Sequence, residues 1–175
     1  IKQVHRAELA RLNCLVFKPK IDDRYSKTEV ASHNRNTFPS IVVDKAADII
    51  PHIERKTDVI GVDEAQFFDP QIIEIVTQLA DAGKRVLVAG LDTDWQGKPF
   101  GPMPTLLATA DVIHKQYAIC MVCGDPATRT QRLVPQHDDI LVGSTGMYEA
   151  RCRNHFDPHL SQRMTHAANE VRPGK

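Results

Sequence analysis

Short apolar runs alternate with amphipathic stretches through the first 111 residues of the chain. The runs lie at residues 13–19, 41–43, 58–63 and 85–91, and stretches with apolar residues at helical spacing separate most of them. Uninterrupted apolar strands that alternate with helices are typical of a parallel sheet covered on both faces. We therefore predict an α/β fold, with a domain over residues 1–111 in which helices flank a parallel sheet.

The stretches between the apolar runs carry recognisable helix signals. Residues 1–12 have apolar side chains on one face and predict a helix. Asp44 is expected to cap a second helix, and Asp69 followed by Pro70 to begin a third. The polar residues of 22–39 predict a long loop, which in a compact domain is usually functional or disordered.

Composition excludes several classes of protein. The 175 residues contain 22 basic and 22 acidic side chains, which gives a net charge of zero and a pI near 7.2. A generic nucleic-acid binder usually carries a basic excess, and a membrane span needs about 18–20 apolar residues in a row. Four cysteines in a chain of this size do not indicate a secreted disulfide scaffold. We predict a cytoplasmic protein without nucleic-acid or membrane partners.

The character of the sequence changes after Asp111, where segments of hairpin size replace the alternating pattern. We predict a small second domain at residues 112–158, followed by a polar tail at 159–175.

Two short-spaced pairs of metal-ligand residues lie in this second part. Cys120 and Cys123 form one pair, Cys152 and His155 the other, and 28 residues separate the pairs. Two such pairs can supply a closed tetrahedral shell for Zn²⁺, and a shell filled by four protein ligands is structural. The alternatives are a disulfide, which a cytosolic setting disfavours, or unlinked buried thiols. Cys14 lies in an apolar run and is better explained as a small buried hydrophobe.

The apolar run 58–63 ends in the acidic pair Asp63-Glu64. Ligands bind at the carboxyl ends of strands in open α/β sheets, so this pattern is similar to a Walker B motif. An aspartate there can hold the Mg²⁺ that bridges nucleotide phosphates, and a neighbouring glutamate can act as general base. Acidic strand ends also often only cap a turn, so the pattern alone leaves both readings open.

Aromatic residues flank the acidic pair. Phe67 and Phe68 follow it, and Trp95 and Phe100 lie on the loop after the last strand of the first domain. Aromatic faces beside a carboxylate suit a flat base stacked over a reactive hydroxyl. The alternative is that they close the core, which we consider the better explanation for Phe68.

A phosphate-binding loop of the form G-x-x-x-x-G-K-[ST] does not occur in the 175 residues. The chain starts within a helix that precedes its first strand, whereas a P-loop opens the helix after the first strand. We expect the loop to lie upstream of Ile1, and we therefore interpret residues 1–111 as an α/β domain with a parallel sheet of the P-loop type.

With these motifs in the same order, the chain resembles the zinc-containing, cellular type of thymidine kinase (type II). The resemblance is carried by residues 22–26, 32–34, 63–68, 98–104, 120–123, 128–133 and 148–153. It implies transfer of the γ-phosphate of ATP–Mg²⁺ to the 5′-hydroxyl of thymidine, which yields dTMP for nucleoside salvage and DNA synthesis.

The resemblance also implies roles for individual residues. Glu64 is the base that takes the 5′-hydroxyl proton, and Asp63, Asp22 and Arg24 are on the Mg²⁺ and phosphate side. Thymidine is bound by the remaining matched positions, which are Phe67, Leu91, Trp95, Phe100, Thr130, Leu141, Val142, Gly143 and Tyr148. Residues 141–148 match a loop called the lasso, which closes over the base and whose two ends the zinc site anchors.

Three positions depart from the pattern of that family. Trp95 stands where Phe is usual, Ser144 where a second glycine is common, and His155 where many members have cysteine.

The resemblance further implies a homotetramer and feedback inhibition by dTTP.

Two other readings of the motifs are a DEAQ-type ATPase and a zinc-ribbon module that binds nucleic acid. A helicase motor needs a second nucleotide-clamping domain, which 175 residues do not supply. Neutral charge and the lack of a basic–aromatic pattern argue against the ribbon.

Overall fold

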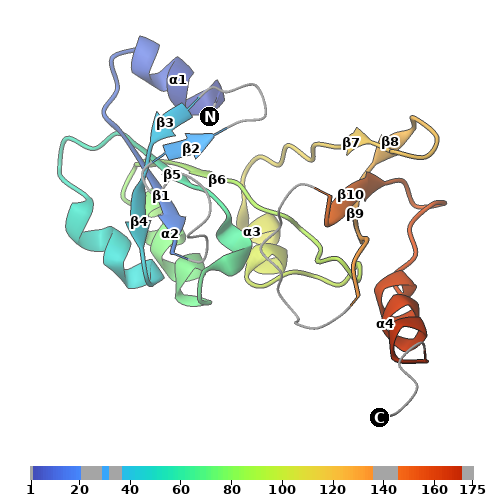
Figure 1. The fold of residues 1–175 in the computed structure, drawn as a ribbon. Coiled ribbons are helices and arrows are strands. Elements are labelled where there is room, and N and C mark those ends of the chain that lie inside the picture. Colours follow the sequence, from blue (N-terminus) through green and yellow to red (C-terminus); the bar gives the residue numbers. More distant parts are fainter. Residues whose placement is uncertain (1, 21–28, 32–36, 136–145, 171–175) are drawn as a thin grey trace. The chain divides into compact units, whose positions relative to one another are not determined.

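The computed structural model describes residues 2–20, 29–31, 37–135 and 146–170 (Figure 1). The chain divides into two compact units, one made of residues 1–92 and 100–111, the other of residues 93–99 and 112–175. Residues 93–99 thus belong to the second unit although they interrupt the first in sequence.

The first unit is built on a parallel sheet of four strands. Their order across the sheet is β4-β1-β5-β6, and every neighbouring pair is parallel. The strands are β1 (Cys14–Pro19), β4 (Ile41–Val43), β5 (Val59–Val62) and β6 (Arg85–Val88). Helices flank this sheet (Figure 1), so the predicted α/β fold is confirmed.

Alternate residues of the strands face opposite sides of the sheet. Phe17 and Ile60 join a large core formed with the helices η1 (Ala46–His52), α2 (Gln71–Asp81) and α3 (Met103–Thr109). Val16 joins a smaller cluster with Val4 of α1 (Lys2–Leu9). Each large apolar side chain buried in this way stabilises the fold by about 1.5–3 kcal/mol. The uniformly apolar strands of the sequence reflect this burial on both faces.

The helix expected after Asp44 is a 3₁₀ helix, and Asp44 does not cap it. Pro51 lies inside η1, where it has no N–H to donate and its ring would clash with the backbone of an α-helix. The backbone N–H of Ala46 donates instead to Asp69 Oδ2 at 2.9 Å, and Asp44 pairs with Lys20 at the surface. Asp69 Oδ1 also accepts from the N–H of Gln71, the first residue of α2, at 3.1 Å, while Pro70 occupies the N-cap position.

The stretch expected as a long loop contains a short antiparallel ribbon. Its strands are β2 (Glu29–Ala31) and β3 (Thr37–Pro39). Phe38 of this ribbon is buried in the small cluster with Val4, so apolar burial orders part of a segment that is otherwise polar.

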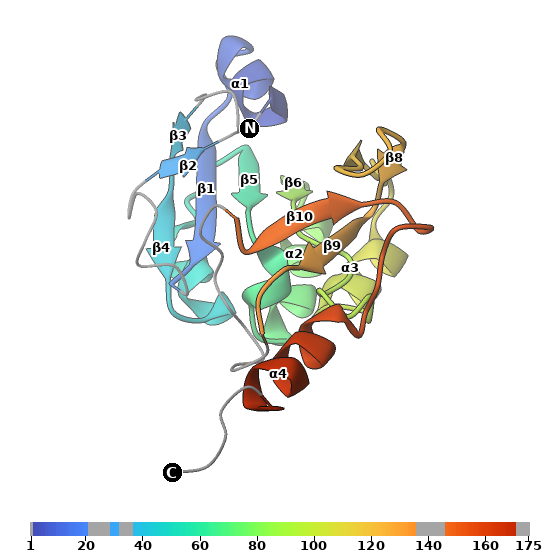
Figure 2. The same ribbon diagram turned by 45° about the vertical axis from the view of Figure 1, so that its right-hand side comes forward.

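The described residues of the second unit include two short antiparallel ribbons and a helix. One ribbon pairs β7 (Ala118–Ile119) with β8 (Pro126–Ala127), and the other pairs β9 (Arg129–Arg132) with β10 (Tyr148–Arg151). Figure 2 shows the second ribbon as two long arrows lying side by side.

The polar segment after residue 158 contains a helix that was not expected, α4 (Leu160–Glu170). Ser161 is only 1% exposed and its hydroxyl donates to the carbonyl of Val134 at 2.6 Å. Asp157 accepts a hydrogen bond from the backbone N–H of His159 at 3.0 Å and forms an ion pair with Arg163. Its carboxylate therefore binds a backbone N–H just before the helix that would otherwise lack a partner. These contacts come from tertiary structure, so the polar sequence gave no sign of the helix.

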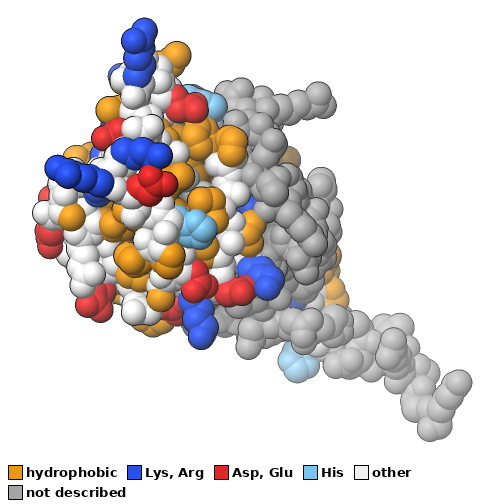
Figure 3. All heavy atoms as spheres, turned by 90° about the vertical axis from the view of Figure 1, so that its left-hand side faces the viewer, with side chains coloured by type: hydrophobic (Ala, Val, Ile, Leu, Met, Phe, Trp, Pro, Cys, Tyr) orange, Lys and Arg blue, Asp and Glu red, His pale blue; other side chains and the backbone are white. Residues whose placement is uncertain are grey.

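On the face of the first unit that Figure 3 shows, charged side chains lie between the apolar ones. Within the described part of the chain, none of the helices has the length and apolar character needed to cross a membrane.

Candidate active site and metal centre

The acidic pair lies where β5 ends, at the carboxyl edge of the parallel sheet. The Asp63 N–H donates to the carbonyl of Phe17 at 2.9 Å, and the Ala65 N–H to that of Ala89 at 3.0 Å. Between them Glu64 has a φ of +51°, in the left-handed region. A non-glycine residue held there costs about 1–3 kcal/mol, and such residues cluster at active sites. The strained backbone therefore supports the reading of Glu64 as functional rather than as a cap of a turn.

Burial raises the pKa of Asp63, because a carboxylate removed from water loses hydration. The backbone N–H of Glu64 and the charge of Lys18 act in the opposite direction. A cation beside Asp63 would favour its charged form, so the residue suits the metal and phosphate side of a nucleotide site.

Gln66 connects Glu64 to the end of the neighbouring strand. Its Nε2 lies 2.5 Å from Glu64 Oε2, and its Oε1 accepts from the backbone N–H of Leu91 at 3.0 Å. Gln66 belongs to the short helix η2 (Ala65–Phe67) and is 3% exposed. The sequence analysis gave this residue no role. The sequence signal that could have pointed to Gln66 is that it is a polar residue between the apolar Ala65 and Phe67, two positions after Glu64.

The aromatic residues of the first unit divide between site and core. Phe67 packs edge-to-face against Phe100, with ring centroids 5.3 Å apart and planes at 86°. Both rings are partly exposed, whereas Phe68 is 5% exposed and part of the main core. The explanation of Phe68 as a core residue is confirmed.

Leu91, another predicted thymidine contact, is exposed in the first unit, and the remaining ones that the structure describes lie in the second unit. Trp95 packs against Arg132, whose guanidinium carbon is 5.1 Å from the ring centroid. Arg132 stands opposite Tyr148 in the β9–β10 ribbon and two residues from Thr130 on the same face. One face of this ribbon therefore gathers all three predicted residues around Arg132.

Five predicted site residues lie outside the described residues. They are Asp22, Arg24, Leu141, Val142 and Gly143.

The two short-spaced pairs meet in the second unit, as predicted. The ligand atoms of Cys120, Cys123, Cys152 and His155 all lie within 4.8 Å of one another. The Cys123 and Cys152 sulfurs are 3.8 Å apart, and His155 Nδ1 is 3.2 Å from the Cys152 sulfur. All four cysteines of the chain are free thiols, so the disulfide alternative is excluded here. Three thiol groups and an imidazole form a set that can bind a metal ion such as zinc.

The backbone shapes this cluster for anionic sulfur. Burial opposes ionisation of Cys120, but backbone N–H groups of Cys152, Val122 and Cys123 hydrogen-bond its sulfur and lower its pKa to about 6. Gly124, with φ +81°, closes the turn through its N–H to the carbonyl of Cys120 at 2.9 Å. A thiolate is the form that ligates metal, so the turn favours that form at Cys120. At Cys123 the backbone N–H of Asp125 also lowers the pKa, but burial and hydrogen bonds to the Asp125 carboxylate and the neighbouring thiols outweigh it and raise the pKa to about 12.

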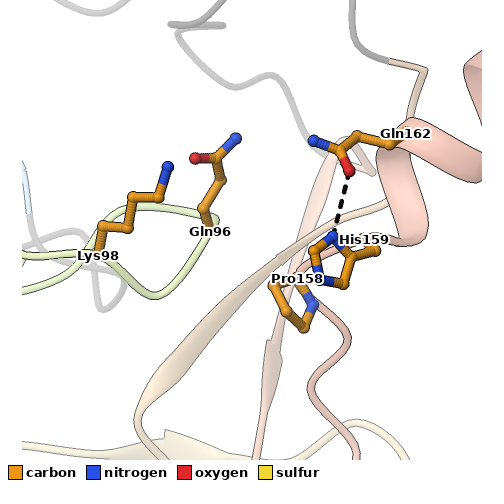
Figure 4. A pocket seen from close by; sticks show the side chains of 5 residues that line it. All are labelled: Gln96, Lys98, Pro158, His159 and Gln162. Atoms are coloured by element: carbon orange, nitrogen blue, oxygen red, sulfur yellow. Dashed lines mark hydrogen bonds between the residues drawn. The ribbon is translucent and has the colours of Figure 1, made fainter.

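A pocket of about 270 Å³ also lies in the second unit. Figure 4 shows Gln96 and Lys98 on one side of it, and Pro158, His159 and Gln162 on the other. His159 Nδ1 is 3.1 Å from Gln162 Oε1. The sequence analysis did not predict this pocket.

Comparison with known proteins identifies the family. The model of the thymidine kinase family matches residues 1–156. This chain belongs to the thymidine kinase family. A curated thymidine kinase of Bdellovibrio bacteriovorus is 51% identical over 160 residues, which are 91% of this chain and 78% of that protein. The resemblance drawn from the motifs is confirmed, and the chain is that of a thymidine kinase enzyme.

Proposed function

We propose that this protein transfers the γ-phosphate of ATP to the 5′-hydroxyl of thymidine and so forms dTMP for nucleoside salvage. Family membership supports the substrate class. The single observation that carries the catalytic assignment is Glu64, a carboxylate at the carboxyl end of β5 with a strained backbone and a fixed hydrogen-bond partner.

In this proposal Glu64 accepts the proton of the 5′-hydroxyl as its oxygen attacks the γ-phosphorus. The new O–P bond forms while the bond from phosphorus to the β,γ-bridging oxygen breaks, and ADP leaves. Mg²⁺ bound with ATP would neutralise charge that develops on the phosphate oxygens. Asp63 would hold this ion at the strand end, and Asp22 and Arg24 are proposed for the same side.

The thymidine contacts implied by the resemblance are proposed for this chain. Those that lie in the described part of the chain are Phe67, Leu91, Trp95, Phe100, Thr130 and Tyr148. Aromatic rings offer flat apolar faces suited to the base. The lasso residues Leu141, Val142 and Gly143 would contact it through backbone atoms, as the resemblance implies.

The metal centre is proposed to hold Zn²⁺ through three thiolates and an imidazole. Four protein ligands fill a tetrahedral shell, so the ion would be structural and leave no position for substrate. It would fasten the ends of the lasso, because Cys120 and Cys123 precede that loop and Cys152 and His155 follow it.

The remaining expectations also stand as proposals. They are a homotetramer, feedback inhibition by dTTP and a cytoplasmic location. The neutral net charge is consistent with a protein that handles small nucleosides and not nucleic-acid polymers.

The deciding experiment measures thymidine phosphorylation by the protein as its gene encodes it. Glu64→Gln removes the base and should lower kcat by about 10²–10⁴-fold with thymidine affinity largely kept. Glu74→Gln, on the exposed surface of α2, is the matched control and should keep the wild-type rate.

A rate that barely changes in Glu64→Gln would show that Glu64 is not the base. ATP hydrolysis stimulated by nucleic acid, without thymidine turnover, would favour the DEAQ-type ATPase instead. Salt-sensitive oligonucleotide binding without either activity would favour the zinc-ribbon module.

A further inference from the structure

We propose that Gln66 is a positioning residue that fixes the carboxylate of Glu64 and ties it to the backbone of Leu91. The inference rests on the proposed role of Glu64 as the base. It assigns a role to a side chain that no motif argument singled out.

The direction of the Gln66 amide is determined by its partners. The backbone N–H of Leu91 can only donate, so it selects the carbonyl oxygen Oε1, which lies 3.0 Å away. The amide nitrogen Nε2 is then directed to Glu64 Oε2 at 2.5 Å. A neutral donor thus faces the carboxylate, and a charge-assisted hydrogen bond of this kind is about twice as strong as a neutral one.

Neighbouring residues keep the amide in this place. Gln66 is 3% exposed, so its own amide is shielded from water, whereas its partners Glu64 and Leu91 lie at the exposed edge of the sheet. A Cβ added to Gly90 would stand 2.7 Å from Gln66 Oε1 and 2.8 Å from the sulfur of Met103. The absence of a side chain at position 90 leaves the space that the amide occupies.

Holding the base in one place matters for the rate of proton transfer. A carboxylate side chain has three rotatable bonds, and a misplacement of about 1 Å can lower a rate by 10²-fold. The φ of +51° orients the backbone of Glu64, while Gln66 restrains the far end of its side chain. Because the same amide binds Leu91, the base and the start of the loop after β6 are positioned together.

The test compares Gln66→Met with Gln78→Met. Gln78 lies on the exposed surface of α2, where its Nε2 donates to Glu74 at 2.9 Å, so the control removes an amide–carboxylate bond of the same type. Gln66→Met should lower kcat for thymidine about 10- to 100-fold with little change in KM. Gln78→Met should keep both constants.

A second variant guards against loss of folding. Gln66→Glu keeps an oxygen that can accept from Leu91 but places a carboxylate against Glu64. Two carboxylates in contact lower the stability, so the variant is assayed at a temperature at which circular dichroism shows it to be folded, and there it should lose kcat as Gln66→Met does. A folded Gln66→Glu protein with wild-type kcat would overturn the proposal.

A double-mutant cycle with Glu64→Ala separates this inference from the proposed function. If Gln66 acts through Glu64, then Gln66→Met should not lower kcat further once Glu64 is alanine. Equal losses in both backgrounds would show a general structural role and overturn the inference, while the base assignment stands. If Glu64→Ala alone keeps the wild-type kcat, the base assignment and the inference fail together.

Discussion

Gly101 provides a sharp test of the packing beside the proposed base. It is exposed and has a φ of +49°, yet a Cβ at this position would overlap the backbone carbonyl oxygen of Gln66. The backbone of Gln66 cannot move aside as a flexible side chain would, because the hydrogen bonds around Ala65 hold the turn to the neighbouring strand. We therefore expect Gly101→Ala to destabilise the first unit.

The control is Gly83→Ala at the end of α2. Gly83 has a φ of +79° and nothing within 4 Å of an added Cβ, so it has the backbone strain without the overlap. Left-handed strain costs about 1–2 kcal/mol in each variant. In Gly101→Ala alone, the overlap destabilises the fold by a further amount of about 1–3 kcal/mol, which is the usual cost of an extra methylene in a packed region. Effects of alanine on the unfolded chain are common to both variants and cancel in the comparison.

Thermal unfolding followed by far-ultraviolet circular dichroism measures the difference. At about 2–4 °C per kcal/mol for a chain of this size, Gly101→Ala should melt about 2–12 °C below Gly83→Ala. Equal melting temperatures would refute the close approach of residue 101 to the backbone of Gln66.

Two further predictions concern the metal centre and the acidic strand end. Cys123→Ser should lower the zinc content from about one ion per chain to none, and should shift the fluorescence of Trp95, the only tryptophan, to longer wavelength as its packing on Arg132 loosens. Cys14→Ser, outside the cluster, is the control, and a variant that loses zinc with unchanged fluorescence would contradict the coupling. Burial raises the pKa of Asp63, so its ionisation opposes folding above that pKa and the wild type gains stability as the pH falls through it. Without nucleotide or Mg²⁺, Asp63→Asn should therefore melt above the wild type at pH 7, with the difference vanishing below about pH 3.9; a constant difference would refute this.

Short-range patterns in the sequence were sufficient to predict much of the fold. The apolar runs around Phe17 and Ile60 identified buried parallel strands, because both faces of such a strand exclude water. The C-x₂-C and C-x₂-H pairs identified the four side chains that cluster as candidate metal ligands, because the geometry of a tetrahedral ion limits the spacing of ligands.

Errors arose where distant residues decide the outcome. The first N–H of η1 is bound by Asp69, 23 residues away from Ala46, and not by the neighbouring Asp44. Pro51, which accounts for the 3₁₀ form of η1, was by contrast a local signal. The helix α4 was missed because its first turn is fixed by a hydrogen bond from Ser161 to Val134. Neither partner is visible in a local window of sequence.

The sequence by itself determined the chemistry that the chain carries: an acidic pair at a strand end, aromatic residues around it and a set of four metal ligands. These depend on residue type and short spacing, which a sequence states directly. Only the tertiary structure decided how that chemistry is held. The link from Glu64 through Gln66 to Leu91 spans two strands that are adjacent in the sheet but 25 residues apart in the chain. The placement of Trp95 on Arg132 likewise joins residues that meet only because residues 93–99 fold with the second unit.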